Sequence, residues 1–393
     1  MSILSPDEKS EAEDELSELS SKGLRVVGAS QKNIPSEHQP SLHDQIHGLQ
    51  FLGFVALKDP IRKGVKEAVE AAKIAGIKTV IVTGDHALTA KAVAEEVGLP
   101  VGPDNVMEGR HLDALENKEL SQLLPQISVF ARVEPTHKLR IIEAWQEQGA
   151  VVAMTGDGVN DAPALKKADI GLALGSGTDV AKETADVVLL DDNFAVIPAA
   201  IREGRVILDN IRKIITYMLS GTFTETILIG STLVLGAPFL PVTALQILWI
   251  NLVEDTLPGI ALATEKAEKD VLRRRPPKPN TSILTKQMKT IVFVISLITD
   301  LLLLGMFYWL LHYTPYTQTH IQTIIFVGLG ISSLLYVFSC KSLRKNIWGY
   351  NPFSNLWLVG SVLVGFLLLA AVIYTPLLQQ LFETEPLSLE DWI

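Results

Sequence analysis

The sequence has a single cysteine and fewer basic than acidic residues, and both features exclude classes of protein. Cys340 has no second cysteine with which to form a disulfide, and a cysteine-based zinc site needs several thiolates. Lysine and arginine number 34 against 44 acidic residues, so the formal net charge is −10. A nucleic-acid partner is not expected, because phosphate backbones bind basic surfaces. Residues 1–18 are acidic and polar, which does not fit a secretory signal peptide.

Long apolar runs are missing from the first half of the chain and dominate from about residue 214 onward. Five stretches of the second half are long enough to cross a bilayer as helices, which takes about 20 residues. A single stretch of this kind can be a buried core helix, but five in succession with short loops favour a membrane domain. The predicted spans are about 212–235, 243–263, 289–311, 321–340 and 355–378.

Basic residues predict the orientation of these spans. Lysine and arginine are frequent in 273–289 and 341–345, whereas 312–320 contains neither. By the positive-inside rule the basic loops are cytoplasmic, and the domain before the first span is then cytoplasmic too. We expect a multi-pass protein of a bacterial-type plasma membrane. With five spans, the acidic segment 383–393 lies outside or begins a sixth helix.

The first half reads as an α/β domain. A helix at 6–21 and a strand at 24–29 come first, and from residue 49 apolar strands alternate with amphipathic helices. This alternation predicts a parallel sheet covered on both faces. A helix pattern then continues from 195 to about 235; a bend near Gly204 is the alternative. The predicted strands of the alternating part are 50–57, 78–82, 127–131, 151–154, 170–174 and 186–190, and its helices are 63–75, 87–97, 136–148 and 179–185.

Polar loops follow three of these strands, at the edge of a parallel sheet where ligands bind. The first loop is Thr83-Gly84-Asp85, in which a hydroxyl and a glycine amide can donate to phosphate oxygens. The second leads into a helix whose first turn carries Lys138, a cation that can neutralise a phosphoryl group. Taken singly, the first loop is more often a plain turn, and Lys138 more often a solvated lysine.

The third loop is the most informative stretch. Residues 154–171 read Met-Thr-Gly-Asp-Gly-Val-Asn-Asp-Ala-Pro-Ala-Leu-Lys-Lys-Ala-Asp-Ile-Gly. Asp157 and Asp161 lie around Gly158 and Asn160, directly after an apolar strand. Acids in this position can hold Mg²⁺ against a phosphoryl group. An ordinary strand-turn-helix with solvated acids is the alternative.

This run closely resembles the hinge motif of the P-type ATPases, the cation pumps of the haloacid-dehalogenase superfamily. The order and strand context of the other two loops match the same family, and the resemblance extends from about residue 24 to the C-terminus. It is nearest to type II pumps of the calcium-pump kind. It implies a haloacid-dehalogenase-like (Rossmann-like) parallel-sheet domain followed by a transmembrane helix bundle. It also implies hydrolysis of ATP, with Mg²⁺, coupled to cation transport across a lipid membrane.

The resemblance also implies roles for single residues. The residue matching Asp157 ligates Mg²⁺, and those matching Asp85 and Asp161 hold the site together. Arg25 resembles an arginine that reaches the phosphates of ATP, and Asp59-Pro60-Ile61-Arg62 resembles the hinge between two domains. The residues expected to contact the phosphoryl group are Thr83, Gly84, Lys138 and Asn160.

One departure from the family outweighs the rest. The nucleophile of these pumps is the aspartate of an Asp-Lys-Thr-Gly-Thr sequence, and no such sequence occurs among the 393 residues. Without an acceptor carboxylate no aspartyl-phosphate can form. We therefore expect this polypeptide not to turn over ATP alone, and to work with a complementary N-terminal pump fragment. The alternatives are a non-catalytic membrane protein that binds Mg²⁺, phosphate or a cation, and a membrane-tethered phosphatase, which would need an Asp-x-Asp pair that is missing.

Acidic residues inside two of the predicted spans indicate a cation site. Glu225 lies in the first span, and Asn251, Glu254 and Asp255 lie in the second, before Pro258-Gly259. A charged residue inside a bilayer costs roughly 2.5–3.5 kcal/mol on insertion, so it is a candidate for function. Carboxylates together with carbonyls freed by a broken helix suit a hard cation. The alternative is that these side chains pair with one another or cap helices.

The family comparison supports this site. Glu225, Asn251 and Asp255 match cation ligands of calcium pumps, whereas other positions depart. Thr222 stands where those pumps have asparagine, Glu254 stands where they have threonine, and Ser333 falls about where they have glutamate. No family role is assigned to Asp300. Calcium is favoured as the transported cation, with manganese, sodium and protons left open.

These observations divide the chain into four parts. Residues 1–48 are interpreted as the remnant of a nucleotide-binding domain, 49–195 as the phosphorylation domain, 196–211 as a stalk helix and 212–393 as the transmembrane domain.

Overall fold

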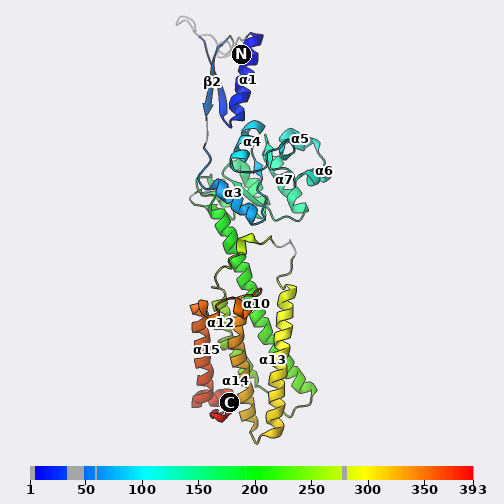
Figure 1. Ribbon diagram of the computed structural model, residues 1–393, viewed down its shortest axis with the longest axis vertical. Helices are drawn as coiled ribbons and strands as arrows, with labels where there is room; N and C mark the ends of the chain where they lie inside the picture. Colours follow the sequence, from blue (N-terminus) through cyan, green and yellow to red (C-terminus); the bar gives the residue numbers. More distant parts are fainter. Residues whose placement is uncertain (1–4, 33–47, 58–59, 191, 277–280, 393) are drawn as a thin grey trace. The chain divides into compact units, whose positions relative to one another are not determined.

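The computed structural model describes residues 5–32, 48–57, 60–190, 192–276 and 281–392, apart from two side chains, those of Ser21 and Arg25. The chain forms two compact units. Unit 1 comprises Met1–Ile201 and Leu272–Thr281, and unit 2 comprises Arg202–Val271 and Ser282–Ile393. All of the described strands belong to unit 1, and unit 2 is built from helices (Figure 1).

Unit 1 begins with a helix and a hairpin. Helix α1 (Pro6–Ser21) starts at Ser5, whose hydroxyl accepts from the amide of Glu8 while the Glu8 carboxylate accepts from the amide of Ser5. Strands β1 (Arg25–Gln31) and β2 (Gln50–Leu57) then pair antiparallel. The strand at 50–57 is confirmed, but its expected place in a parallel sheet is wrong, because the preceding strand is its partner.

Six short strands of unit 1 form two parallel sheets. The first has the order β3-β5-β4 and the second β6-β7-β8. Parallel pairing is confirmed, but the single sheet is replaced by two three-stranded sheets among the described residues. β4 was not predicted, since three residues are too few to show a pattern. The bounds are β3 (Ile81–Val82), β4 (Val106–Glu108), β5 (Val129–Ala131), β6 (Ala153–Gly156), β7 (Ile170–Leu174) and β8 (Val187–Leu189).

Seven helices accompany these strands. Apolar residues of α5, α6 and β5 form the largest core of unit 1, in which Leu112, Leu120 and Phe130 are fully buried. This core holds β5 in place, and therefore holds the loop that follows it. The helices are α3 (Val65–Ile74), α4 (Ala87–Glu96), α5 (Gly109–Ala114), α6 (Asn117–Leu123), α7 (Pro135–Glu147), α8 (Ala162–Lys167) and α9 (Asp179–Thr184).

Helix α10 (Val196–Val234) begins in unit 1 and ends in unit 2. Its 39 residues form one uninterrupted helix that passes through Gly204. At 1.5 Å per residue it is about 58 Å long. The prediction of a continuous helix is confirmed, and the alternative of two helices separated near Gly204 is wrong.

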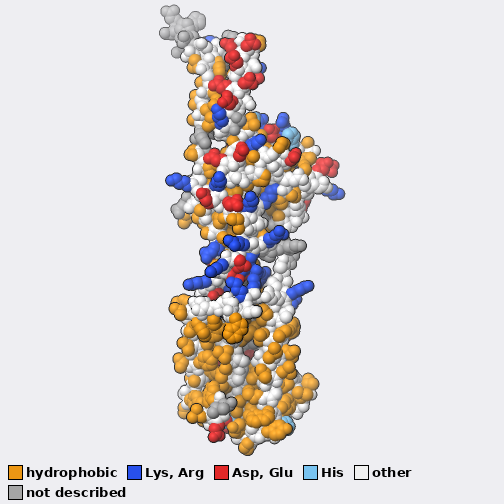
Figure 2. All heavy atoms as spheres, viewed as in Figure 1, with side chains coloured by type: hydrophobic (Ala, Val, Ile, Leu, Met, Phe, Trp, Pro, Cys, Tyr) orange, Lys and Arg blue, Asp and Glu red, His pale blue; other side chains and the backbone are white. Residues whose placement is uncertain are grey.

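Unit 2 packs the rest of α10 with the remaining helices around an apolar core that includes Phe307, Phe326 and Leu228. Its outer surface along the helices is mostly hydrophobic, with basic side chains gathered at one end (Figure 2). The other helices are α11 (Ala244–Trp249), a π-helical turn (Ile250–Glu254), α12 (Thr256–Leu262), α13 (Lys286–Tyr313), α14 (Gln318–Tyr336), α15 (Leu356–Tyr374) and α16 (Pro376–Phe382).

Among the described residues, three helices are long and apolar enough to cross a membrane: Lys286–Tyr313, Gln318–Lys341 and Leu356–Tyr374. They coincide with the last three of the five predicted spans. The stretch 212–235 lies inside α10, and 243–263 is divided among α11, the π turn and α12. That these two also cross the membrane stays a prediction.

Candidate phosphate site and candidate cation site

The loops after β3 and β5 are joined through their backbones. The amide of Val133 donates to the carbonyl of Thr83 at 3.1 Å, and the amide of Arg132 donates to the carbonyl of Asp85 at 2.9 Å. Within the first loop the hydroxyl of Thr83 donates to the carboxylate of Asp85 at 3.0 Å. Gly84 and Asp85 are exposed, so their polar groups face solvent. The backbone bonds hold the Thr83 loop beside the chain that enters α7.

Helix α7 carries Lys138, which follows the second loop, to the third loop. The Lys138 ammonium donates to Oδ1 of Asp161 at 2.5 Å, and both side chains are at least four-fifths buried. The other oxygen, Oδ2, accepts from the amides of Asp157 at 3.3 Å and Gly158 at 3.2 Å. The structure thus brings together three of the predicted residues: Lys138, Asp157 and Asp161.

Asp161 is held in its ionised form. Burial raises the pKa of its carboxyl, but the hydrogen bond and charge of Lys138 and the two loop amides outweigh burial and lower the pKa below its usual value. Gly156 is required beside it, because a Cβ at that position would lie 2.5 Å from the Cβ of Asp161. Asp161 therefore organises the loop, as the resemblance implies.

Asp157 and Asn160 project from the same loop and are exposed. The carbonyl of Asp157 accepts from the amide of Thr178 at 2.8 Å, which fixes its backbone, while its carboxylate has no partner among the described residues. One open carboxylate beside a phosphate-binding loop suits Mg²⁺, which is usually held by one or two carboxylates together with phosphate oxygens and water. The residues present therefore fit this metal, and Asp157 is the residue that would hold it.

Two further predicted residues belong to unit 1. Arg25 lies in β1 opposite Leu57, and its side chain is outside the described part of the chain. Asp59 of the predicted hinge also lies outside the described residues. Arg62 forms an ion pair with Asp192 at 3.0 Å. Arg62 has no contact with the Lys138–Asp161 pair among the described residues.

The candidate cation site in unit 2 is built on a local break in helical geometry. The amide of Asp255 donates to the carbonyl of Ile250 at 2.8 Å, five residues back, so residues Ile250–Glu254 form a π-helical turn. Pro258 has no amide to donate to the carbonyl of Glu254. Turns of this kind frequently occur at functional sites. The sequence located the break at Pro258-Gly259, and the structure places it one turn earlier.

Glu225 and Asn251 meet across α10 and the π turn. The side-chain amide of Asn251 donates to both carboxylate oxygens of Glu225, at 2.9 and 2.8 Å. Asp255 binds different partners: its Oδ1 accepts from the hydroxyl of Tyr217 at 2.8 Å and from that of Ser333 at 2.5 Å. Three predicted ligands are thus buried or partly buried in one region, and they belong to two groups: Glu225 with Asn251, and Asp255 with its two hydroxyl donors.

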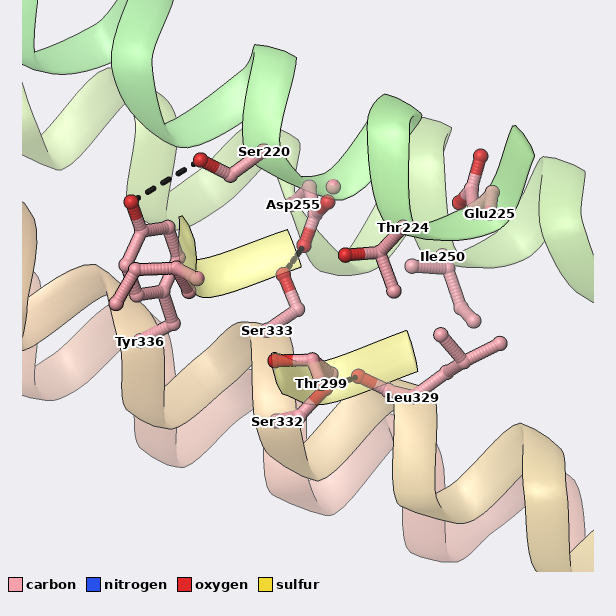
Figure 3. A pocket seen from close by; sticks show the side chains of 12 residues that line it. Ser220, Thr224, Glu225, Ile250, Asp255, Thr299, Leu329, Ser332, Ser333 and Tyr336 are labelled. Atoms are coloured by element: carbon pink, nitrogen blue, oxygen red, sulfur yellow. Dashed lines mark hydrogen bonds between the residues drawn. The ribbon is translucent and has the colours of Figure 1, made fainter. Parts of the chain in front are cut away.

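A cavity of about 30 Å³ lies beside these two groups of residues. Both Glu225 and Asp255 line it, together with hydroxyl-bearing residues of α10, α13 and α14 (Figure 3). Its polar lining residues are Ser220, Thr224, Thr299, Ser332, Ser333 and Tyr336. A cavity of this size holds about one water molecule, which is also the scale of a dehydrated cation. Its polar lining and carboxylates suit a hard cation.

Glu254 is buried in a different place. It is 0% exposed, neither carboxylate oxygen has a hydrogen-bond partner among the described residues, and it does not line the cavity. It packs against Gly330 of α14, where a Cβ would lie 2.6 Å from its Oε1. Asp300 of α13 is likewise buried with both oxygens unpartnered. Thr222 is exposed and donates to the carbonyl of Met218, so it does not take part.

Sequence reasoning missed Tyr217, Ser332 and Tyr336, and it named Ser333 only as a position where calcium pumps have glutamate. A signal was present on α10, where Tyr217, Gly221 and Glu225 recur at steps of four and so share one helix face. Gly221 lies against Asp255, since a Cβ there would be 3.3 Å from its Oδ2. In the described part of the chain no three histidine, cysteine or acidic side chains converge as a metal site.

Comparisons with known proteins agree across the whole chain. Residues 239–393 match the family model described as "Cation transporting ATPase, C-terminus", and residues 8–169 and 138–201 match two models of haloacid dehalogenase-like hydrolases. The chain is 41% identical over 392 residues to a calcium-transporting ATPase of Bacillus subtilis, covering 100% of this chain and 44% of that protein.

Two further relatives carry similar names. Identity is 40% over 351 residues with the calcium-transporting ATPase lmo0841 of Listeria monocytogenes, covering 89% of this chain and 39% of that protein. It is 37% over 405 residues with calcium-transporting ATPase 1 of Bacillus cereus, covering 99% and 45%. The chain therefore spans less than half the length of these curated relatives.

Proposed function

Because the chain belongs to the family of cation-transporting P-type ATPases, we propose that it is the phosphate-handling and cation-binding part of a pump that couples ATP hydrolysis to cation transport. Calcium is the proposed cation, by analogy with the names of its relatives. The observation that carries the proposal is the Asp157–Asp161 loop held by Lys138, in a chain that also buries Glu225 and Asp255 beside one polar cavity.

The proposed chemistry divides among the residues of unit 1. Mg²⁺, when bound, neutralises charge on the transferring phosphoryl group. Asp157 holds that ion, while the hydroxyl of Thr83, the amide of Gly84 and the side-chain amide of Asn160 orient the phosphoryl oxygens. Lys138 supplies positive charge beside them, and Asp161 fixes its ammonium. Asp85 orients the hydroxyl of Thr83, with which it shares a hydrogen bond of 3.0 Å.

The nucleophile must come from elsewhere, because the chain contains no Asp-Lys-Thr-Gly-Thr sequence. The two parallel sheets support a complementary N-terminal pump fragment as its source. β3 is an edge of one sheet and β6 is an edge of the other, and an edge strand has backbone groups free to pair with a further strand. A parallel strand added there would end beside the loops that follow β3 and β6. ATP would bind with that fragment, and Arg25 is proposed to reach its phosphates.

In unit 2 the proposed cation ligands are Glu225, Asn251 and Asp255, with Glu254 as a fourth. Asn251 now presents its amide nitrogen to Glu225, so its oxygen becomes a ligand only if the amide turns over. We propose that a cation draws the carboxylates of Glu225 and Asp255 toward the cavity between them. Lipid surrounds the helices of unit 2, and unit 1 lies on the cytoplasmic side of a bacterial-type plasma membrane.

The test is co-expression of the chain with a fragment that carries the Asp-Lys-Thr-Gly-Thr segment, followed by incubation with ATP labelled in its γ-phosphate. We expect an acid-stable phosphoenzyme only when both polypeptides are present, and only when calcium is added. Asp157→Asn and Glu225→Gln should each reduce the label at least tenfold. Thr222→Ala is the matched control, since Thr222 is exposed.

A second candidate, favoured by the missing nucleophile, is a membrane protein that binds phosphate or a cation without turnover. If this second candidate is right, the two co-expressed polypeptides form no labelled phosphoenzyme, while calcium still raises the thermal stability of the purified chain. Magnesium-dependent ATP hydrolysis by the chain alone, abolished by Asp157→Ala, would contradict both candidates.

A further inference from the structure

A second cavity of unit 2 lies among the start of α13, the first half of α10 and the segment after α14. Its volume is about 390 Å³, far larger than the cavity beside Glu225. Four basic side chains line it: Arg212, Lys213, Lys286 and Arg344. The proposed transport cycle gives this cavity no role.

The charges around this cavity do not cancel. Its acidic lining residues are Asp209 and Glu268, so four cations face two carboxylates. Both acids and Lys213 also have partners: Glu268 accepts from the hydroxyl of Ser342 at 2.8 Å, and Lys213 donates to Oδ1 of Asn210 at 2.9 Å. The formal excess of positive charge favours an anion.

The inner basic residues differ from those at the mouth. Lys213 is only 3% exposed, whereas Lys286 and Arg344 are exposed. Inside the cavity wall, Nε of Arg212 is buried and has no hydrogen-bond partner among the described residues. Guanidinium groups match the oxygen geometry of phosphate.

Backbone donors add to the side chains. α13 begins at Lys286, after Thr285, whose hydroxyl accepts from the amide of Met288 at 3.2 Å. The amides of Lys286 and Gln287 have no intrahelical acceptor, because they belong to the first turn of a helix. The start of a 28-residue helix also carries partial positive charge. The cavity therefore combines cationic side chains with the start of a helix.

We propose that this cavity binds the phosphate group of an anionic ligand. Two sources share that chemistry: the headgroup of an anionic phospholipid and free inorganic phosphate. The lipid source has support from α13. This helix starts at the cavity and is itself one of the described helices that are long and apolar enough to cross a membrane. A headgroup at Lys286 would thus have its acyl chains beside an apolar helix surface.

The experiment uses the full chain purified in detergent and stripped of lipid. Native mass spectrometry measures retention of phosphatidylglycerol and of phosphatidylcholine, whose choline cancels the phosphate charge. Equilibrium dialysis measures binding of labelled orthophosphate. We expect phosphatidylglycerol to bind at least tenfold more tightly than phosphatidylcholine, and Arg212→Gln/Arg344→Gln to reduce that binding at least tenfold.

The matched control is the double variant Lys289→Gln/Lys345→Gln. It removes two exposed charges that are close in sequence to lining residues but do not line the cavity. It should bind phosphatidylglycerol as the unchanged chain does. Leu343→Trp is the second variant; it narrows the cavity without changing a charge, and it keeps the test valid if the arginine variant misfolds. Orthophosphate binding that both cavity variants abolish would support the site with free phosphate as the ligand. Equal binding by the cavity variants and the control would overturn the proposal.

Discussion

Asp161 in unit 1 and Glu254 in unit 2 are both buried carboxylates, but their surroundings differ. Asp161 accepts from Lys138 and from two backbone amides. Glu254 has no partner among the described residues, and Asp300 in the same unit has none either. The charge in unit 1 is compensated by the chain itself. For Glu254 and Asp300 no donor among the described residues provides this compensation, so it must come from a bound cation or from protons.

The difference matters for what each site can do before a ligand arrives. A polar network whose hydrogen bonds are all formed within the chain is rigid, so its groups are already positioned before a phosphoryl group binds. A region with uncompensated carboxylates can change its packing when charge enters. We infer that the network around Asp161 is preformed, whereas the charges of Glu254 and Asp300 are compensated only when a cation or a proton binds.

The largest expected effect comes from breaking the compensated pair. Lys138→Met should lower the free energy of unfolding of unit 1 by about 3–5 kcal/mol, because it leaves Asp161 as a buried charge without its cation. Hydrogen exchange of the β6 and α8 amides in the full chain measures this loss. Lys166→Met, at an exposed lysine of α8, should change it by less than about 0.5 kcal/mol. An equal loss of unfolding free energy in both variants would mean that Lys138 does not compensate the buried charge of Asp161.

A smaller effect is expected where Glu254 packs on α14. Gly330→Ala should destabilise unit 2 by about 1–3 kcal/mol, since the added methyl would lie 2.6 Å from Oε1 of Glu254. Combining it with Glu254→Ala should remove most of that strain. Unfolding in mixed micelles, analysed as a double-mutant cycle, gives the coupling between the two positions.

The control for this cycle is Gly305→Ala in α13, where a Cβ would meet nothing within 4 Å. It should be neutral or stabilising by up to about 1 kcal/mol, because glycine is unfavourable inside a helix. A destabilisation equal to that of Gly330→Ala would show that the helix, and not contact with Glu254, sets the cost.

The smallest effect concerns a second compensated acid of unit 1. Hydrogen bonds from Ser176 and then the charge of Arg62 lower the pKa of Asp192 to about 2. Because the folded pKa is depressed, the associated stabilisation is present above the unfolded value of about 3.9 and is lost as the pH falls toward 2. A carboxyl NMR titration of the full chain should find its midpoint near 2. Arg62→Gln should raise that midpoint; an unchanged midpoint would assign the shift to Ser176 alone.

Elements with long, regular patterns could be predicted from sequence. Helix 6–21 and strand 170–174 have the predicted bounds, and α10 is continuous. The three-residue strand β4 and the antiparallel pairing of β2 could not be predicted, because strand partners are chosen by contacts distant in sequence. The apolar pattern of a strand indicates that the strand is buried, but it does not identify the neighbouring strand with which it pairs.

The candidate sites show the same division. Composition and spacing along the chain identified Asp157, Asp161 and the acids of unit 2. Tyr217 and Ser333 were not assigned to Asp255, because they lie 38 and 78 positions from it and meet it only after the helices pack. The resemblance implied that Lys138 and Asp161 share a site, but the direct ion pair between them required the fold.

The sequence by itself determined where charge and apolar surface lie: acids after apolar strands, acids inside apolar stretches, and the absence of a nucleophile motif. These features are local, and chain connectivity preserves them in any fold. Only the tertiary structure decided which acids are compensated, because a hydrogen bond depends on distances of about 3 Å between helices and strands that the sequence separates. In the folded chain Asp161 is paired with a lysine. Glu254 lies against a glycine and receives no hydrogen bond from the described residues.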